Sequence, residues 1–97
     1  MVTYKTASGK VYDISAFSQQ ERECYDWLIE EAKVCTSWME FYPRTERGTI
    51  NCAKKVARDE WLDHPLRYIQ LDLNQYLMVK YKEARGEPRE LSDIITE

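Results

Sequence analysis

The sequence is poor in the residues from which the commonest ligand sites are built. Its three glycines, Gly9, Gly48 and Gly86, stand apart, so there is no glycine-rich loop of the kind that cradles phosphate groups. It has a single histidine and no Cys-x-x-Cys pair, so it carries no motif for a structural zinc site. We therefore expect no metal ion, no cofactor and no enzyme activity.

Long apolar runs are also missing. The longest contains four residues, Tyr76 to Val79, whereas a helix needs roughly 20 apolar residues to cross a bilayer. Residues 1–5 show no basic region that leads into an apolar stretch, so we expect no secretion signal. These features predict a cytoplasmic protein with no membrane partner.

Cysteines are few and odd in number, which argues against a disulfide framework and favours a reducing compartment. Cys24 and Cys35 fall on one predicted helix, roughly 16 Å apart, and cannot form a bridge within the chain. Cys52 and His64 are the minimum pair for thiol catalysis, but they lie at opposite ends of another predicted helix. Their separation of about 18 Å argues against catalysis by this pair.

The residues that are present suffice for one modest core. Of the 97 residues, 43% are hydrophobic and 32% are charged, a balance typical of one folded domain rather than a disordered segment. The net charge is −3, but the charges are segregated along the chain. Residues 43–58 contain five basic residues and one acid, whereas residues 13–42 and 59–97 are acidic.

The N-terminal residues 2–15 alternate apolar and polar side chains, which predicts a β-hairpin. Residues 2–6 and 10–15 are its strands, and residues 7–9 are its turn, in which Gly9 supplies a positive φ angle. A two-stranded hairpin alone is only marginally stable in water. We therefore expect it to pack on the helices or to pair with a strand of another chain.

The first helix is predicted over residues 18–41. Ser18 and Glu21 match the capping box, in which each side chain binds a free backbone amide at the helix start. Pro43 disfavours a helical conformation in the residue before it, so the helix is expected to end at about Phe41. Its apolar residues cover roughly twice the arc of about 100° that an ordinary surface helix buries, which predicts a central helix covered from two sides.

Two further helices follow. Residues 43–48 are expected to form a polar, basic loop that leads into a helix over residues 49–62. Pro65 at a first helical position marks a third helix, over residues 65–85, with one of the two preceding residues as its cap.

The expected fold class is α+β and mainly α, with a short N-terminal hairpin followed by three helices in one domain. The first and third helices are expected to pack antiparallel, with the second crossing them. The tail, residues 89–97, either docks as a short turn or stays loose.

Aromatic residues make up 12% of the chain, more than one small core is expected to hold. Tyrosine and tryptophan suit interfaces because they are large, stiff and partly polar. With the wide apolar arcs of two helices, they predict a non-enzymatic protein-interaction module, of the adaptor, inhibitor or immunity type, that forms a homodimer or binds a protein partner. The expected interface residues are Phe41, Tyr42, Tyr68, Leu71, Met78 and Tyr81.

The alternative function is a small regulator that binds nucleic acid or another phosphate ligand through the basic segment. A short basic helix preceded by a longer helix is typical of DNA-reading helix-turn-helix proteins. The predicted loop is longer than the turn of that motif and the rest of the chain is acidic, so the interaction module is favoured. The candidate phosphate contacts are Arg44, Arg47, Lys54, Lys55 and Arg58.

Overall fold

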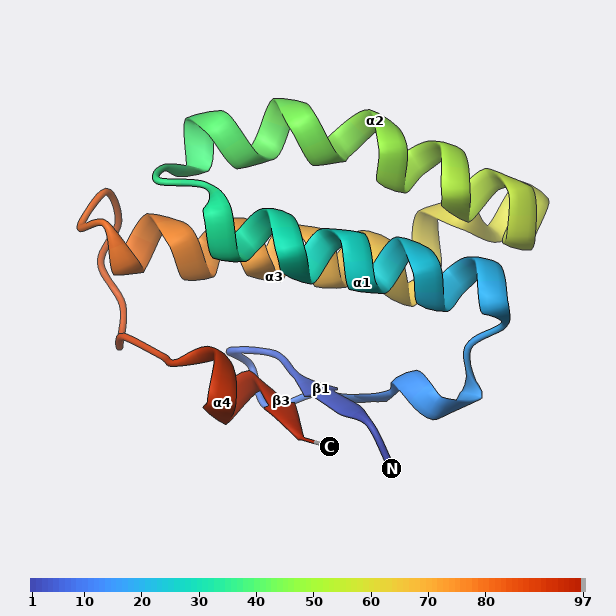
Figure 1. Cartoon of the computed structure of the whole chain (residues 1–97), viewed down its shortest axis with the longest axis horizontal. Helices are drawn as coiled ribbons and strands as arrows, with labels where there is room; N and C mark the ends of the chain where they lie inside the picture. The colour runs from blue at the N-terminus through green and yellow to red at the C-terminus, as the bar shows by residue number, and fades with distance from the viewer. Residues whose placement is uncertain (97) are drawn as a thin grey trace.

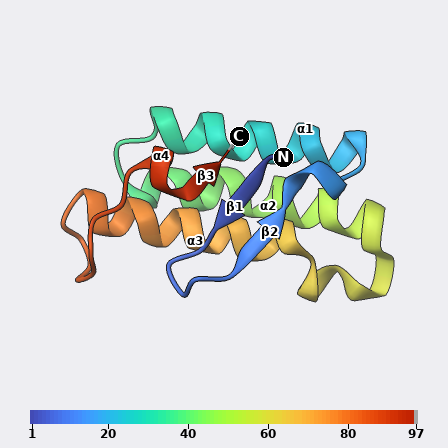
Figure 2. The ribbon, with the colours of Figure 1, turned by 90° about the horizontal axis from the view of Figure 1, so that it is seen from below.

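The protein is built in three layers (Figures 1 and 2). A computed structural model describes the backbone of residues 1–96 and the side chains of residues 1–55 and 61–96. Helix α2 lies on one side of a layer formed by α1 and α3, and a small sheet with α4 covers the opposite side of that layer. The elements in chain order are β1 (Thr3–Lys5), β2 (Val11–Asp13), η1 (Ile14–Ala16), α1 (Gln19–Val34), α2 (Trp38–Ala57), η2 (Arg58–Asp63), α3 (Pro65–Lys80), α4 (Leu91–Ile94) and β3 (Ile95–Thr96). The expected class, α+β and mainly α with an N-terminal hairpin and three long helices, is confirmed.

The sheet has three antiparallel strands in the order β2-β1-β3. The hairpin pairs Tyr4 with Tyr12, and Gly9 in its turn has a φ of 93°, as the sequence predicts. The third strand comes from the tail, where Ile95 pairs with Tyr4. The described part of the tail is therefore docked, because Ile94 is buried and β3 supplies the pairing that a lone hairpin lacks.

Helix α1 begins where the capping box predicts. The Ser18 hydroxyl accepts a hydrogen bond from the amide of Glu21 at 3.2 Å, and the Glu21 carboxylate accepts one from the amide of Ser18 at 2.8 Å. The helix ends at Val34, however, and the expectation of one helix over residues 18–41 is wrong. Ser37 starts a new helix, because its hydroxyl accepts a hydrogen bond from the amide of Glu40 at 3.2 Å.

Pro43 lies inside α2 and does not end a helix. The predicted loop over residues 43–48 is therefore helical, and the predicted start of the second helix at residue 49 is wrong. A proline inside a helix removes one hydrogen bond, here the one to the carbonyl of Met39. Both Pro43 and Met39 are exposed, so water can reach that carbonyl and the cost is tolerated.

The long α2 also reverses the predicted direction of the other two helices. Because α2 returns the chain along its whole length, α1 and α3 run parallel rather than antiparallel (Figure 1). The contacts at both ends agree with this direction. Glu21 and His64, at the starts of α1 and α3, are hydrogen-bonded at 2.7 Å, and Tyr81 after α3 donates to the carbonyl of Cys35 after α1 at 3.4 Å.

Helix α3 starts with Pro65 at its first position and His64 as its cap, as predicted, but it is shorter than expected. The predicted end at residue 85 is wrong, because Lys82 adopts a φ of 61° and turns the chain out of the helix after Lys80. The amide of Glu83 then donates to the carbonyl of Met78 at 2.7 Å, which satisfies a free carbonyl at the helix end.

The core lies on both sides of the α1–α3 layer. Towards α2 it contains Phe41, and towards the sheet it contains Tyr4, whose ring meets the ring of Tyr25 edge-on at 6.3 Å. The largest fully buried side chains include Tyr4, Ile14, Leu28, Phe41, Leu66, Ile69, Leu73, Leu77 and Ile94.

A carboxylate on α3 anchors the sheet to the helices. Asp72 accepts hydrogen bonds from the Tyr4 hydroxyl at 2.6 Å and from the amide of Ala7 at 3.0 Å. Arg89, in the segment that returns from α3 to the sheet, donates to both of its oxygens, at 3.1 and 3.4 Å. Burial, then the charge of Asp72 and the hydrogen bond to it, raise the pKa of Tyr4 far above its ordinary value, so the phenol stays a donor.

A second polar contact joins the starts of α1 and α3. His64 Nδ1 accepts the amide of Leu66 at 3.1 Å, so the neutral ring carries its proton on Nε2 and donates it to Glu21. Burial would raise the pKa of Glu21, but hydrogen bonds from Ser18 and His64 outweigh it and hold that pKa below its ordinary value of 4.5. The ionised carboxylate therefore stabilises the folded state.

Glu21→Gln should lower the free energy of unfolding by about 1 kcal/mol near neutral pH, because the ionised acceptor of both contacts is lost. Since the folded pKa of Glu21 lies below the unfolded one, its stabilisation is present above pH 4.5 and is lost as the pH falls through the folded pKa. Urea unfolding of both proteins from about pH 7 to about pH 3 measures this difference. A difference that stays constant into the acid range would contradict this role.

Candidate functional site

A groove opens between α2, η2 and α3. It has a volume of about 140 Å³ and continues at Leu71 into a wider hollow of about 570 Å³ between α3 and the hairpin. Leu62, Tyr68 and Leu71 are exposed here by 52%, 36% and 39%. We call this surface the aromatic face and define it by Tyr12, Tyr42, Ile50, Trp61, Leu62, Tyr68 and Leu71.

Three of the six predicted interface residues lie on the aromatic face, namely Tyr42, Tyr68 and Leu71. Phe41 does not, because it is fully buried, and its assignment to an interface is wrong. The reason is the earlier start of α2, which turns Phe41 towards α1 and α3. Met78 and Tyr81 lie roughly two to three turns further along α3, outside both hollows.

Four members of the aromatic face were not predicted. Ile50 and Trp61 have the spacing of an inward stripe in a regular helix, and Leu62 follows them. The chain leaves α-helical geometry at η2, so Trp61 and Leu62 meet Ile50 at the groove instead of lying on a common helix face. Tyr12 joins from β2, and only the docking of the hairpin beside α3 brings it there.

The walls of the groove carry buried polar atoms. Gln70 is buried and donates to the Thr45 hydroxyl at 3.2 Å. Thr49 is also buried, and within the described part of the protein its hydroxyl has no hydrogen-bond partner. A buried polar atom left without a partner costs free energy, so this hydroxyl makes an unfavourable contribution to the stability of the groove wall.

The tyrosines at the rim are held by acidic neighbours. A hydrogen bond to Glu46 at 3.1 Å raises the pKa of Tyr42, and one to Asp63 at 3.1 Å raises the pKa of Tyr68. Both phenols therefore stay neutral at physiological pH. They present a flat apolar ring with a polar edge, which is the character of tyrosines at protein interfaces.

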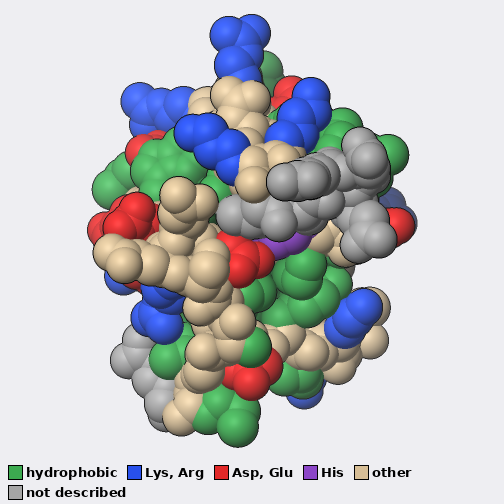
Figure 3. Space-filling view, turned by 90° about the vertical axis from the view of Figure 1, so that its right-hand side faces the viewer, with side chains coloured by type: hydrophobic (Ala, Val, Ile, Leu, Met, Phe, Trp, Pro, Cys, Tyr) green, Lys and Arg blue, Asp and Glu red, His purple; other side chains and the backbone are tan. Residues whose placement is uncertain are grey.

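The predicted phosphate contacts all belong to α2 and the start of η2. Arg44 is engaged by Glu31 at 3.1 Å and Glu40 at 3.6 Å. For Arg47, Lys54 and Lys55, which are exposed, the described residues provide no ion-pair partner at this range. The side chain of Arg58 lies outside the described residues. Figure 3 shows Lys and Arg side chains gathered over the α2 side of one end of the molecule.

Cys52 and His64 are not brought together as a catalytic pair. His64 uses both ring nitrogens, one for Leu66 and one for Glu21. Cys52 instead lies against α1, where its Sγ donates to the carbonyl of Gln20 at 3.8 Å.

No protein-family model matches the chain, and no characterised protein or solved structure matches it. Among the described residues, no three His, Cys, Asp or Glu side chains gather into a metal-binding group. In the same part of the chain, none of the helices has the length and apolar character needed to cross a membrane.

Proposed function

We propose that the protein is a non-enzymatic protein-interaction module, of the adaptor, inhibitor or immunity type, that self-associates through the aromatic face. The observation that carries this proposal is the gathering of Leu62, Tyr68 and Leu71, all exposed, along the groove and the hollow that meet at Leu71. Scattered exposed apolar side chains are ordinary, but a continuous patch of them marks an interaction site.

The charges around the aromatic face support a second copy of the chain as the occupant. Acidic groups, Glu46 and Asp63, alternate there with basic groups, Lys10 and Arg67. In a two-fold dimer the same patch meets itself, so a patch with both signs can pair each charge with its opposite.

We place this module in the cytoplasm. Its three cysteines are free thiols, which is the state that a reducing compartment maintains.

Leu71→Lys should weaken the dimer at least tenfold, about 1.4 kcal/mol, because a charge then replaces the apolar side chain at the centre of the aromatic face. Val34→Lys is the matched control, since Val34 is exposed by 61% and lies at the end of α1, outside this face. Light scattering on a sizing column gives the molar mass of each protein over a range of concentrations. The wild type and Val34→Lys should show twice the chain mass of 11.6 kDa.

A wild-type monomer at all concentrations would contradict self-association. So would a dimer that both lysine variants leave intact, because the interface would then lie elsewhere.

The second candidate function, binding of nucleic acid, is favoured by one specific observation. Because α2 is continuous, Arg44, Arg47, Lys54 and Lys55 fall within about 100° of arc on one side of one helix. From the sequence, Arg44 and Arg47 are expected in a loop, and Lys54 and Lys55 in the helix that follows it. A basic stripe on an outer helix is the footprint with which proteins contact a phosphate backbone.

If the stripe binds nucleic acid, Lys54→Glu combined with Lys55→Glu should abolish an affinity that falls steeply with salt. Lys5→Glu combined with Lys33→Glu changes the net charge equally at exposed sites outside α2 and should retain the affinity. Fluorescence anisotropy with labelled double-stranded DNA at two salt concentrations measures both. Equal losses in the two variants would show that net charge alone matters, and an unmeasurable wild-type affinity would remove this candidate.

A further inference from the structure

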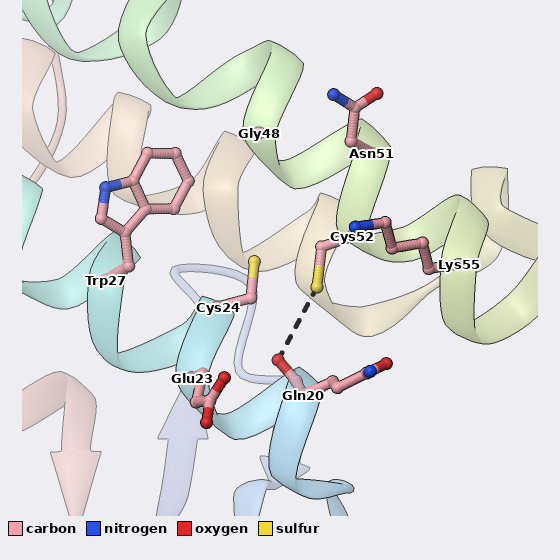
Figure 4. Close-up of a pocket in the computed structure, with 8 residues that line it drawn as sticks. All are labelled: Gln20, Glu23, Cys24, Trp27, Gly48, Asn51, Cys52 and Lys55. Carbon is pink, nitrogen blue, oxygen red and sulfur yellow. Dashed lines mark hydrogen bonds between the residues drawn. The ribbon is translucent and has the colours of Figure 1, made fainter.

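A cavity of about 500 Å³ lies between α1 and α2, on a different side of α2 from the groove of the aromatic face (Figure 4). Cys24 of α1 and Cys52 of α2 enter it from opposite walls, and their sulfur atoms face the same space. The lining residues are Gln20, Glu23, Cys24, Trp27, Gly48, Asn51, Cys52 and Lys55.

The two helices approach closely beside the cysteines. Gly48 lies one turn from Cys52, and a Cβ atom added to it would be 2.6 Å from Cη2 of Trp27. The indole therefore lies directly on the backbone of α2, which only glycine permits. This contact fixes the separation of α1 and α2 at the level of the two thiols.

The two thiols are unequal in access. Cys24 is 8% exposed, whereas Cys52 is partly exposed. Burial raises the pKa of the Cys24 thiol. The negative charge of Cys52 and the hydrogen bond between Cys24 and Cys52 raise the pKa of Cys24 further. A reagent that enters the cavity therefore meets Cys52 first, with Cys24 beside it as a protonated thiol.

We propose that Cys24 and Cys52 are a reactive dithiol, a modification site that low-molecular-weight disulfides such as oxidised glutathione convert into a bond between α1 and α2. In the first step the Cys52 thiolate attacks one glutathione sulfur, a Cys52–glutathione disulfide forms, and one glutathione leaves as its thiolate. In the second step Cys24 loses its proton to solvent and attacks Sγ of Cys52, and the second glutathione leaves. Two protein thiols and one glutathione disulfide thus give one protein disulfide and two glutathione thiols.

The surroundings suit the entry of such a disulfide. The cavity is open to solvent and has polar groups at Gln20, Asn51 and Lys55 that can face a peptide-like disulfide. Its apolar wall, Trp27, is a fluorescent reporter next to the thiols. The third cysteine provides a matched control, because Cys35 is 1% exposed and lies at the far end of α1.

The test exposes the reduced protein to oxidised glutathione, stops the reaction with acid and determines the intact mass and the linked peptides. The wild type and Cys35→Ser should lose two hydrogen atoms and yield a peptide in which Cys24 is joined to Cys52. Cys24→Ser should stop at one added glutathione on Cys52, and Cys52→Ser should stay unmodified over the same time. Tryptophan fluorescence, to which Trp27 contributes beside Trp38 and Trp61, should change at the same rate as the bridge forms in the wild type.

Three results would overturn the proposal. One is a wild-type protein that stays reduced, and another is a wild type that accumulates the glutathione adduct without forming the bridge. The third is a bridge that includes Cys35.

Discussion

The fold depends on one nearly buried carboxylate, that of Asp72, whose negative charge must be paired and hydrogen-bonded. The side chain of Asp72 is only 9% exposed, and it faces the sheet from the middle of α3. A buried charge is costly unless it is paired and hydrogen-bonded, and its partners come from segments that are distant in sequence. Tyr4 and Ala7 come from the hairpin, and Arg89 comes from the segment before β3. One side chain thus holds both ends of the chain against the helices.

The proposed interaction surface depends on the same anchor. Asp72 lies in the wall of the hollow that Tyr12 and Tyr68 share, so the contact that docks the hairpin also completes the aromatic face. If the hairpin were displaced, Tyr12 would leave the face and only its α2–η2–α3 part would remain. The sheet therefore does more than cover the core, because it supplies one edge of the site.

The parts of the fold that the sequence predicted are those set by local signals. The capping box at Ser18 and the proline at position 65 each act within a few residues, and both helix starts were found. Ser37 with Glu40 is an equally local signal for a helix start. Pro43 nevertheless predicts a helix end at about Phe41, because a proline disfavours the helical conformation in the residue before it, whereas Pro43 in fact lies inside α2. Non-local contacts could not be predicted from local signals. Cys24 and Cys52, for example, line the same cavity only because α2 folds back along α1. Asp72 gave a weak signal, an acid beside the apolar stripe of α3, without indicating its partners.

The most direct test of the central claim is urea unfolding of Asp72→Ala beside Asp26→Ala. Asp26 forms an exposed pair with Arg22 on α1, so its loss should change the free energy of unfolding by no more than about 0.5 kcal/mol. Loss of Asp72 leaves Arg89 without its ion-pair partner and removes the hydrogen-bond acceptor of Tyr4 and Ala7. It should therefore lower the free energy of unfolding by about 3–5 kcal/mol. A cost for Asp72→Ala as small as that for Asp26→Ala would contradict the claim that this carboxylate holds the sheet to the helices.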